Sequence, residues 1–142
     1  MLTVGTAREL RDAGLQWTPA ALDLFTVPLP DLEDQVFVIS EMTILAENLH
    51  GHPALTFHGS VEWALDHVWT GDALWIPRED QLRALIEERL AGQAADWHLS
   101  LDSDASGSRC TVTSDAHVSG FSGQDASECL AAALLSILNA AA

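Results

Sequence analysis

The chain has 142 residues, 48% of them hydrophobic and 19% charged, which suits one folded domain and excludes a disordered chain. Its 21 acidic residues oppose only six basic ones, and the resulting formal charge of −15 disfavours a nucleic acid as partner. No apolar run approaches the roughly 20 residues that a membrane-spanning helix needs, so we expect no membrane partner either.

The N-terminal segment predicts a short helix. Thr6 and Glu9 have the spacing of a capping box, in which the threonine caps the helix and the glutamate reaches back to it. The helix is expected to begin at about Ala7. It should end at Gly14, because glycine readily adopts the left-handed backbone of a C-cap.

Short strands are expected next. Residues 22–27 and 35–40 are typical of strands, and the loop between them contains two prolines and three acidic residues. Residues 42–49 fit either a strand or a helix. We favour a strand, because His50-Gly-His-Pro53 looks like a hairpin turn that leads into a further strand at 54–57.

The middle of the chain predicts a helix that is followed by an extended segment. Ser60 is a good N-cap, and Val61, Leu65 and Val68 recur at helical spacing. This helix is expected to end at Gly71. Residues 73–76 then form a brief extended segment.

A further helix is predicted after Pro77, which suits a first helical turn because a proline has no N–H to leave unbonded there. Gly92 is expected to end this helix. Its inner side should carry an apolar stripe of Leu82, Leu85, Ile86 and Leu90.

The C-terminal third predicts strands followed by a helix. Hydrophobic and polar residues alternate over 97–102, a return strand follows at 109–114, and a third extended segment lies near 117–121. Asp125 is expected to cap the final helix. One side of that helix presents Leu130, Leu134 and Leu138.

Two cysteines, Cys110 and Cys129, lack CxxC spacing, and the chain begins without the pattern of a signal peptide. We therefore expect a cytoplasmic protein in which both thiols stay reduced. Cys129 lies within an apolar helical pattern and is expected to be buried.

These elements predict an α+β fold with an antiparallel sheet, three or four helices packed on it, and a C-terminal strand–strand–helix unit. Residues 1–142 are expected to form a single acidic domain. The segment 92–95 could join two sub-lobes, 1–92 and 93–142.

Four segments of the chain carry a resemblance to known proteins. They are Leu10-Arg-Asp-Ala-Gly-Leu15 with Trp17, Val36-Phe-Val-Ile-Ser40 with Met42-Thr43, Glu62-Trp-Ala-Leu-Asp66, and Leu74-Trp-Ile-Pro-Arg-Glu-Asp-Gln-Leu82. On these segments, which cover most of residues 7–90, the chain resembles a family of small uncharacterised bacterial proteins, some of which are labelled as pilus-assembly proteins. That label would imply a nucleotide-binding ATPase. Because the chain has no GxxxxGK(S/T) phosphate loop, the resemblance implies no activity for it.

Three of the five tryptophans, Trp63, Trp69 and Trp75, lie between residues 57 and 90. Tryptophan is enriched at the centres of protein interfaces, and the chain has no recognisable catalytic motif. The first hypothesis is therefore a non-enzymatic interaction module that binds a protein partner or forms a homo-oligomer without a cofactor. The residues expected to make the contact are Trp63, Trp75, Glu62, Asp66 and Arg78.

The second hypothesis is a metal-assisted hydrolase. His50, His52 and His58, with His67 as a further candidate, could hold zinc or nickel. Glu62 and Asp66 lie four residues apart and would share one face of the predicted helix as an acid–base pair. The third hypothesis, which rests on the charge of −15 alone, is an acidic mimic of a nucleic acid.

Overall fold

The computed structural model describes residues 1–32, 35–40, 44–58 and 67–141. The chain divides into two compact units: residues 1–15 with 77–142 form unit 1, and residues 16–76 form unit 2. These bounds differ from the expected sub-lobes 1–92 and 93–142, and the number of independently folding domains stays a prediction. Glu62, Trp63 and Asp66 lie outside the described residues.

The α+β class is confirmed. The described residues form three α-helices and three separate antiparallel sheets of three strands each, where the sequence predicted one sheet. None of these helices is long and apolar enough to cross a membrane. Most strands of unit 2 have only two or three residues.

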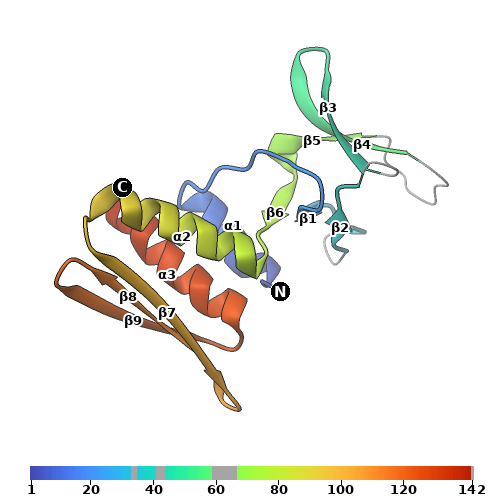
Figure 1. The fold of residues 1–142 in the computed structure, drawn as a ribbon. Helices are drawn as coiled ribbons and strands as arrows, with labels where there is room; N and C mark the ends of the chain where they lie inside the picture. The colour runs from blue at the N-terminus through green and yellow to red at the C-terminus, as the bar shows by residue number, and fades with distance from the viewer. Residues whose placement is uncertain (33–34, 41–43, 59–66, 142) are drawn as a thin grey trace. The chain divides into compact units, whose positions relative to one another are not determined.

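Unit 1 is a layer of helices on a sheet (Figure 1). Its strands β7 (Trp97–Asp104), β8 (Gly107–Ser114) and β9 (His117–Gly123) follow one another in the order β7-β8-β9. Helix α3 (Ala126–Ala141) packs on β8 and β9, and it also contacts α1 (Val4–Asp12) and α2 (Glu79–Gln93). Leu130, Leu134 and Leu138 are buried in this layer, as the sequence predicted.

The capping of α1 differs from the prediction at its start and agrees at its end. Thr3, rather than Thr6, is the N-cap, and its Oγ1 accepts a hydrogen bond from the backbone N–H of Thr6 at 3.1 Å. At the other end Gly14 has a φ of 103°. The backbone N–H groups of Gly14 and Leu15 donate to the carbonyl oxygens of Arg11 and Leu10. These two bonds make a Schellman motif, the left-handed C-cap that was expected.

Helix α2 is shifted toward the C-terminus relative to the prediction. Arg78 is its N-cap, with its backbone N–H donating to Oε1 of Gln81 at 2.9 Å, so Pro77 precedes the helix. The helix continues through Gly92 to Gln93. Because the N–H of Ala94 still donates to the carbonyl of Leu90, the glycine does not end the helical bonding. Of the predicted stripe, Leu82, Ile86 and Leu90 are buried and Leu85 is half-buried.

The C-terminal hairpins follow the predicted alternation. In β7 the hydrophobic residues at 97, 99 and 101 are half-buried, and the residues between them are exposed. Asp125 caps α3, because its Oδ1 accepts from the backbone N–H of Glu128 at 2.9 Å. Both cysteines are free thiols and are buried between the sheet and α3; burial was predicted for Cys129 and not for Cys110.

Unit 2 contains two small sheets around one core. Strands β1 (Leu24–Thr26), β2 (Phe37–Val38) and β6 (Leu74–Ile76) have the order β2-β1-β6. Strands β3 (Ile44–Leu49), β4 (His52–Phe57) and β5 (His67–Trp69) have the order β3-β4-β5, and the 3-10 turn η1 (Thr70–Asp72) follows. Side chains of both sheets make the core: Phe25, Val27, Phe37, Ile39, Ile44, Leu55, Val68 and Ala73.

The strand prediction for residues 42–49 is confirmed over 44–49, the described part. Leu49 pairs with His52, so His50 and Gly51 form a two-residue turn. Both have positive φ angles, 53° and 84°. Two consecutive left-handed residues are the mark of a type I′ turn, whose twist matches that of the strands it joins.

The predicted helix from Ser60 to Gly71 is wrong in its described part. His67–Trp69 is strand β5, and Val68, assigned above to a helical stripe, is buried opposite Leu55 of β4. The reason is tertiary: pairing with β4 satisfies the backbone of these residues, and a valine beside a tryptophan suits a strand.

Candidate interaction surface

One face of the β3-β4-β5 sheet is turned away from the core of unit 2. Residues opposite one another in antiparallel strands share a face, so Ile44 with Phe57 and Leu55 with Val68 define the core face. The opposite face, called here the outer face, continues past β4 to His58. It carries Leu45, Glu47, Leu49, His52, Ala54, Thr56, His58, His67 and Trp69.

Trp69 is the most prominent side chain of the outer face. Its exposed fraction is 38%, a high value for a tryptophan in a folded protein. The imidazole rings of His67 and His52 make T-shaped contacts with the indole ring. The centroid of the His67 ring lies 4.9 Å from that of Trp69, and the centroid of the His52 ring lies 6.0 Å from it. Trp69 also lies directly opposite Ala54, which is only 1% exposed although it is on the outer face. The indole is therefore held in place while part of its surface remains open to solvent.

A hollow of about 450 Å³ lies beside Trp69, where β4 begins and β5 passes into η1. Its lining residues are His52, Pro53, Trp69 and Gly71. A Cβ atom added at Gly71 would meet no atom within 4 Å, so a larger side chain could fill this space without strain. The hollow is wide and open, which suits one side chain of a partner more than an enclosed small molecule.

A hydrogen-bonded cluster lies next to the tryptophan on the outer face. Oγ1 of Thr56 is 2.7 Å from Oε2 of Glu47 and 3.0 Å from Nε2 of His58. An ionised carboxylate can only accept, so the hydroxyl donates its single proton to Glu47 and accepts from His58. A nucleophilic hydroxyl needs the opposite arrangement, with the imidazole as acceptor. The cluster therefore orders the outer face and does not activate Thr56.

The structure does not bring the predicted metal ligands together. His50 is in the hairpin turn, His52 begins β4, and His58 follows the other end of that strand. His52 and His58 are six residues apart along an extended chain, so their backbones are separated by roughly 20 Å. Among the described residues no group of three or more His, Cys, Asp or Glu side chains could hold a metal ion.

Two of the predicted contact residues, Trp75 and Arg78, have other contacts. The ring of Trp75 stacks on that of Trp17, and its Nε1 is buried with no hydrogen-bond partner among the described residues. Nε of Arg78 donates to Oδ1 of Asp80 at 3.1 Å, and this hydrogen bond lowers the pKa of the Asp80 carboxyl. Trp69 was not singled out from the sequence, although its position beside His67 in the tryptophan-rich segment was a usable signal.

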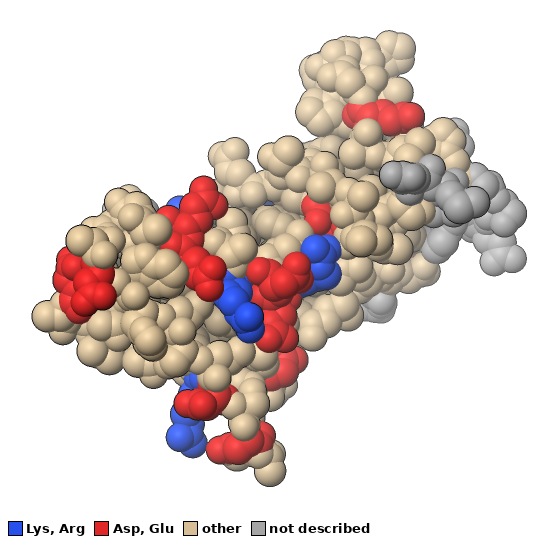
Figure 2. Space-filling model, viewed as in Figure 1, with Lys and Arg blue, Asp and Glu red and all other residues tan. Residues whose placement is uncertain are grey.

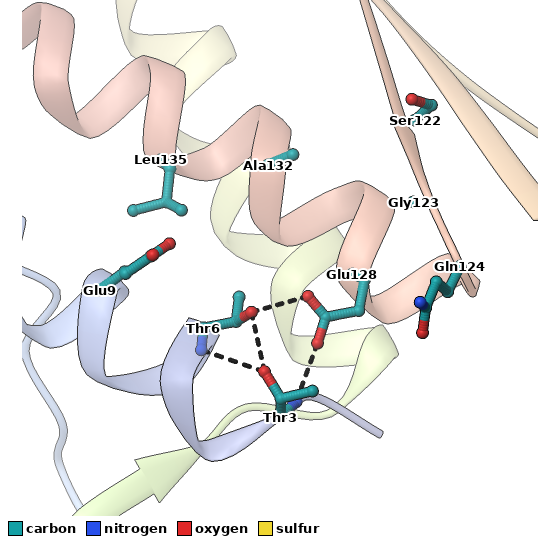
Figure 3. Close-up of a pocket in the computed structure, with 9 residues that line it drawn as sticks. All are labelled: Thr3, Thr6, Glu9, Ser122, Gly123, Gln124, Glu128, Ala132 and Leu135. Atoms are coloured by element: carbon teal, nitrogen blue, oxygen red, sulfur yellow. Dashed lines mark hydrogen bonds between the residues drawn. The ribbon is translucent and has the colours of Figure 1, made fainter.

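Unit 1 has a polar groove of about 420 Å³ between α1, α3 and the end of β9 (Figure 3). Glu128 of α3 occupies one side of it. Its Oε1 accepts from the backbone N–H of Thr3 and its Oε2 from the hydroxyl of Thr6, both at 2.8 Å. Since both carboxylate oxygens are engaged, Glu128 ties α1 to α3.

Charge is distributed unequally between the two units. All six arginines belong to unit 1. Figure 2 shows basic side chains next to carboxylates on the visible face. Three of them form ion pairs with Asp12, Asp80 and Glu79. These pairs interrupt the acidic surface of unit 1, so no observation favours mimicry of a nucleic acid, which stays a prediction.

Comparison with protein-family models, with curated proteins and with solved structures finds no match to this chain. The resemblance drawn from residues 7–90 therefore stays a prediction. Function has to be inferred from the side chains themselves.

Proposed function

We propose that this chain is a non-enzymatic module that binds a protein partner through the outer face of the β3-β4-β5 sheet. The observation that carries the proposal is Trp69, partly exposed, braced by two imidazoles and bordered by an open hollow. A tryptophan held in one orientation loses little conformational freedom on binding, and such residues supply much of the affinity at protein interfaces.

A different protein is a better partner than a second copy of the chain. Residues 16–76 contain nine acidic residues and neither lysine nor arginine: Asp23, Asp31, Glu33, Asp34, Glu41, Glu47, Glu62, Asp66 and Asp72. Pairing two copies through unit 2 would bring together two segments that each carry a negative net charge, and like charges across an interface oppose association.

The proposal is tested with Trp69→Ala and a matched variant, Val118→Ala, which removes a 62% exposed side chain from unit 1. Both variants should keep the circular dichroism spectrum of the wild type. Immobilised wild type and Val118→Ala should capture the same protein from a cell extract, and Trp69→Ala should lose it. The captured protein, once purified, should bind the wild type in a stoichiometric complex.

Equal capture by a folded Trp69→Ala variant would overturn the proposed surface. Sedimentation of each protein alone tests self-association. A wild-type dimer that Trp69→Ala dissociates would show that the partner is a second copy, contrary to the proposal.

A further inference from the structure

We infer that the partner presents an arginine or lysine side chain, whose cationic group binds over Trp69 and pairs with Glu47. This inference rests on the proposed function, because it assigns the chemistry of the group that the outer face receives. It requires a site with an exposed aromatic ring, a carboxylate in reach and no cation nearby.

The ring and the carboxylate lie in one row of the sheet. Glu47 of β3 pairs with Ala54 of β4, and Ala54 pairs with Trp69 of β5. Neighbouring strands are about 4.8 Å apart, so the backbones of Glu47 and Trp69 are separated by about 10 Å, with a small alanine between them. A guanidinium or ammonium group above the alanine would reach both side chains.

The carboxylate of Glu47 can still accept a hydrogen bond from such a cationic group. Its Oε2 accepts the proton of Thr56, while the residue remains exposed at the surface. A carboxylate that already accepts one hydrogen bond can accept further ones through its other oxygen. The bond from Thr56 holds the carboxylate over β4, the strand that lies between the strands of Glu47 and Trp69.

The negative charge of unit 2 favours a basic side chain of the partner over an apolar one as the group that binds over Trp69. Unit 2 has nine acidic residues and no lysine or arginine, so its field attracts a basic segment and no fixed cation of its own competes for Trp69. Tryptophan is also the aromatic residue that binds ammonium and guanidinium groups best. An exposed ring beside an unopposed carboxylate is therefore complementary to a basic side chain.

The test uses peptides of eight arginines, eight glutamates, and alternating glycine and serine, titrated into the full chain while the Trp69 indole resonance is followed by NMR. Only the arginine peptide should bind and shift that resonance. Trp69→Leu keeps apolar cover over Ala54 but has no ring. It should weaken binding about 3- to 30-fold, the range expected for a cation–π contact.

Glu47→Gln and Asp31→Asn form the matched pair. Each removes one negative charge from unit 2, but Asp31 is an exposed residue outside the outer face. Glu47→Gln should weaken binding at least about 3-fold more than Asp31→Asn, as expected for a hydrogen bond between charged groups. Equal losses in the two variants would show diffuse attraction and would overturn the inference.

The two proposals fail in different ways. If Trp69→Ala abolishes capture of the protein partner but the arginine peptide neither binds nor displaces that partner, the basic chemistry is wrong and the interaction surface stands. If capture does not depend on Trp69, the proposed function itself fails. Displacement of the partner by the arginine peptide and not by the glycine–serine peptide supports both.

Discussion

The indole rings of Trp17 and Trp75 lie nearly parallel, 6.2 Å apart between centroids and with an interplanar angle of 7°. Trp17 also contacts Phe25, the residue that pairs with Trp75 across strands β1 and β6. Its Nε1 donates to Oδ2 of the buried Asp23 at 2.9 Å. The stack thus fixes the segment before β1 onto the β2-β1-β6 sheet, and this is a structural role.

Trp75→Ala should therefore destabilise the protein without changing the outer face. Removal of a partly buried tryptophan is expected to lower the free energy of unfolding of unit 2 by about 2–4 kcal/mol. Urea unfolding followed by tryptophan fluorescence measures the effect, with Val118→Ala expected within about 0.5 kcal/mol of the wild type. A stable Trp75→Ala variant that no longer binds its partner would show instead that Trp75 is a contact residue.

Glu128→Ala should loosen α1. The substitution removes the acceptors of the Thr3 N–H and the Thr6 hydroxyl, and hydrogen bonds to a charged group are each worth about 1.5–3 kcal/mol at full burial. We expect a loss of about 1–3 kcal/mol, because the site is only partly buried. Amide hydrogen exchange in α1 should become faster. Glu88→Ala, at an exposed position of α2, is the control and should leave this exchange unchanged.

Substitutions at the two positions of the β3–β4 turn should change the stability of unit 2 in opposite directions. Asn-Gly is the preferred pair for a type I′ turn, so His50→Asn is expected to stabilise unit 2 by about 0.5 kcal/mol. Gly51→Ala places a Cβ on a residue with a φ of 84° and should destabilise it by about 1 kcal/mol. Thermal unfolding of both variants checks the signs. A neutral Gly51→Ala would contradict the assigned turn.

The two cysteines should be unreactive in the folded protein. Burial, with the neighbouring thiol of Cys129, raises the pKa of the Cys110 thiol from 9.0 to about 12. Iodoacetamide at pH 8 should not label Cys110 in the native protein, because the thiolate is the nucleophile, and should label it in denaturant. Cys129 is 0% exposed, so the reagent should reach it only after unfolding. Rapid labelling of native Cys110 would contradict this expectation.

The same pKa shift predicts how stability depends on pH. Folding favours the protonated thiol, so the contribution of Cys110 is complete below about pH 9 and is lost as the pH rises from 9 toward 12. Urea unfolding at pH 8, 9.5 and 11 measures the decline. Cys110→Ala should show a smaller decline than the wild type, since it lacks the titrating group.

Local patterns were enough to predict much of unit 1. The alternation over 97–102, the cap at Asp125 and the leucines of α3 all depend on residues close together in the chain, and each is confirmed. In unit 2 the turn at His50 and Gly51 marked a hairpin for the same reason. The start of α1 was predicted wrongly, because Thr6 and Glu9 have the spacing of a capping box but Thr3 is the N-cap.

Contacts between residues far apart in the chain determined the features of the fold that the sequence patterns did not predict. The N-terminus of α1 depends on Glu128, which is 125 residues away from Thr3 and accepts its N–H. The spacing of the apolar residues suggested a helix that includes residues 67–69. These residues instead form backbone hydrogen bonds with β4, and this pairing cannot be predicted from the spacing of residues along the chain.

The sequence by itself determined the charge and the strands and helices whose patterns are complete within a short segment. The tertiary structure decided which tryptophan is stacked inside, Trp75, and which remains partly exposed, Trp69. It also placed His52 and His58 at opposite ends of one strand. The physical reason is that exposure and proximity depend on partners distant in the chain, whereas spacing along the chain reports only on near neighbours.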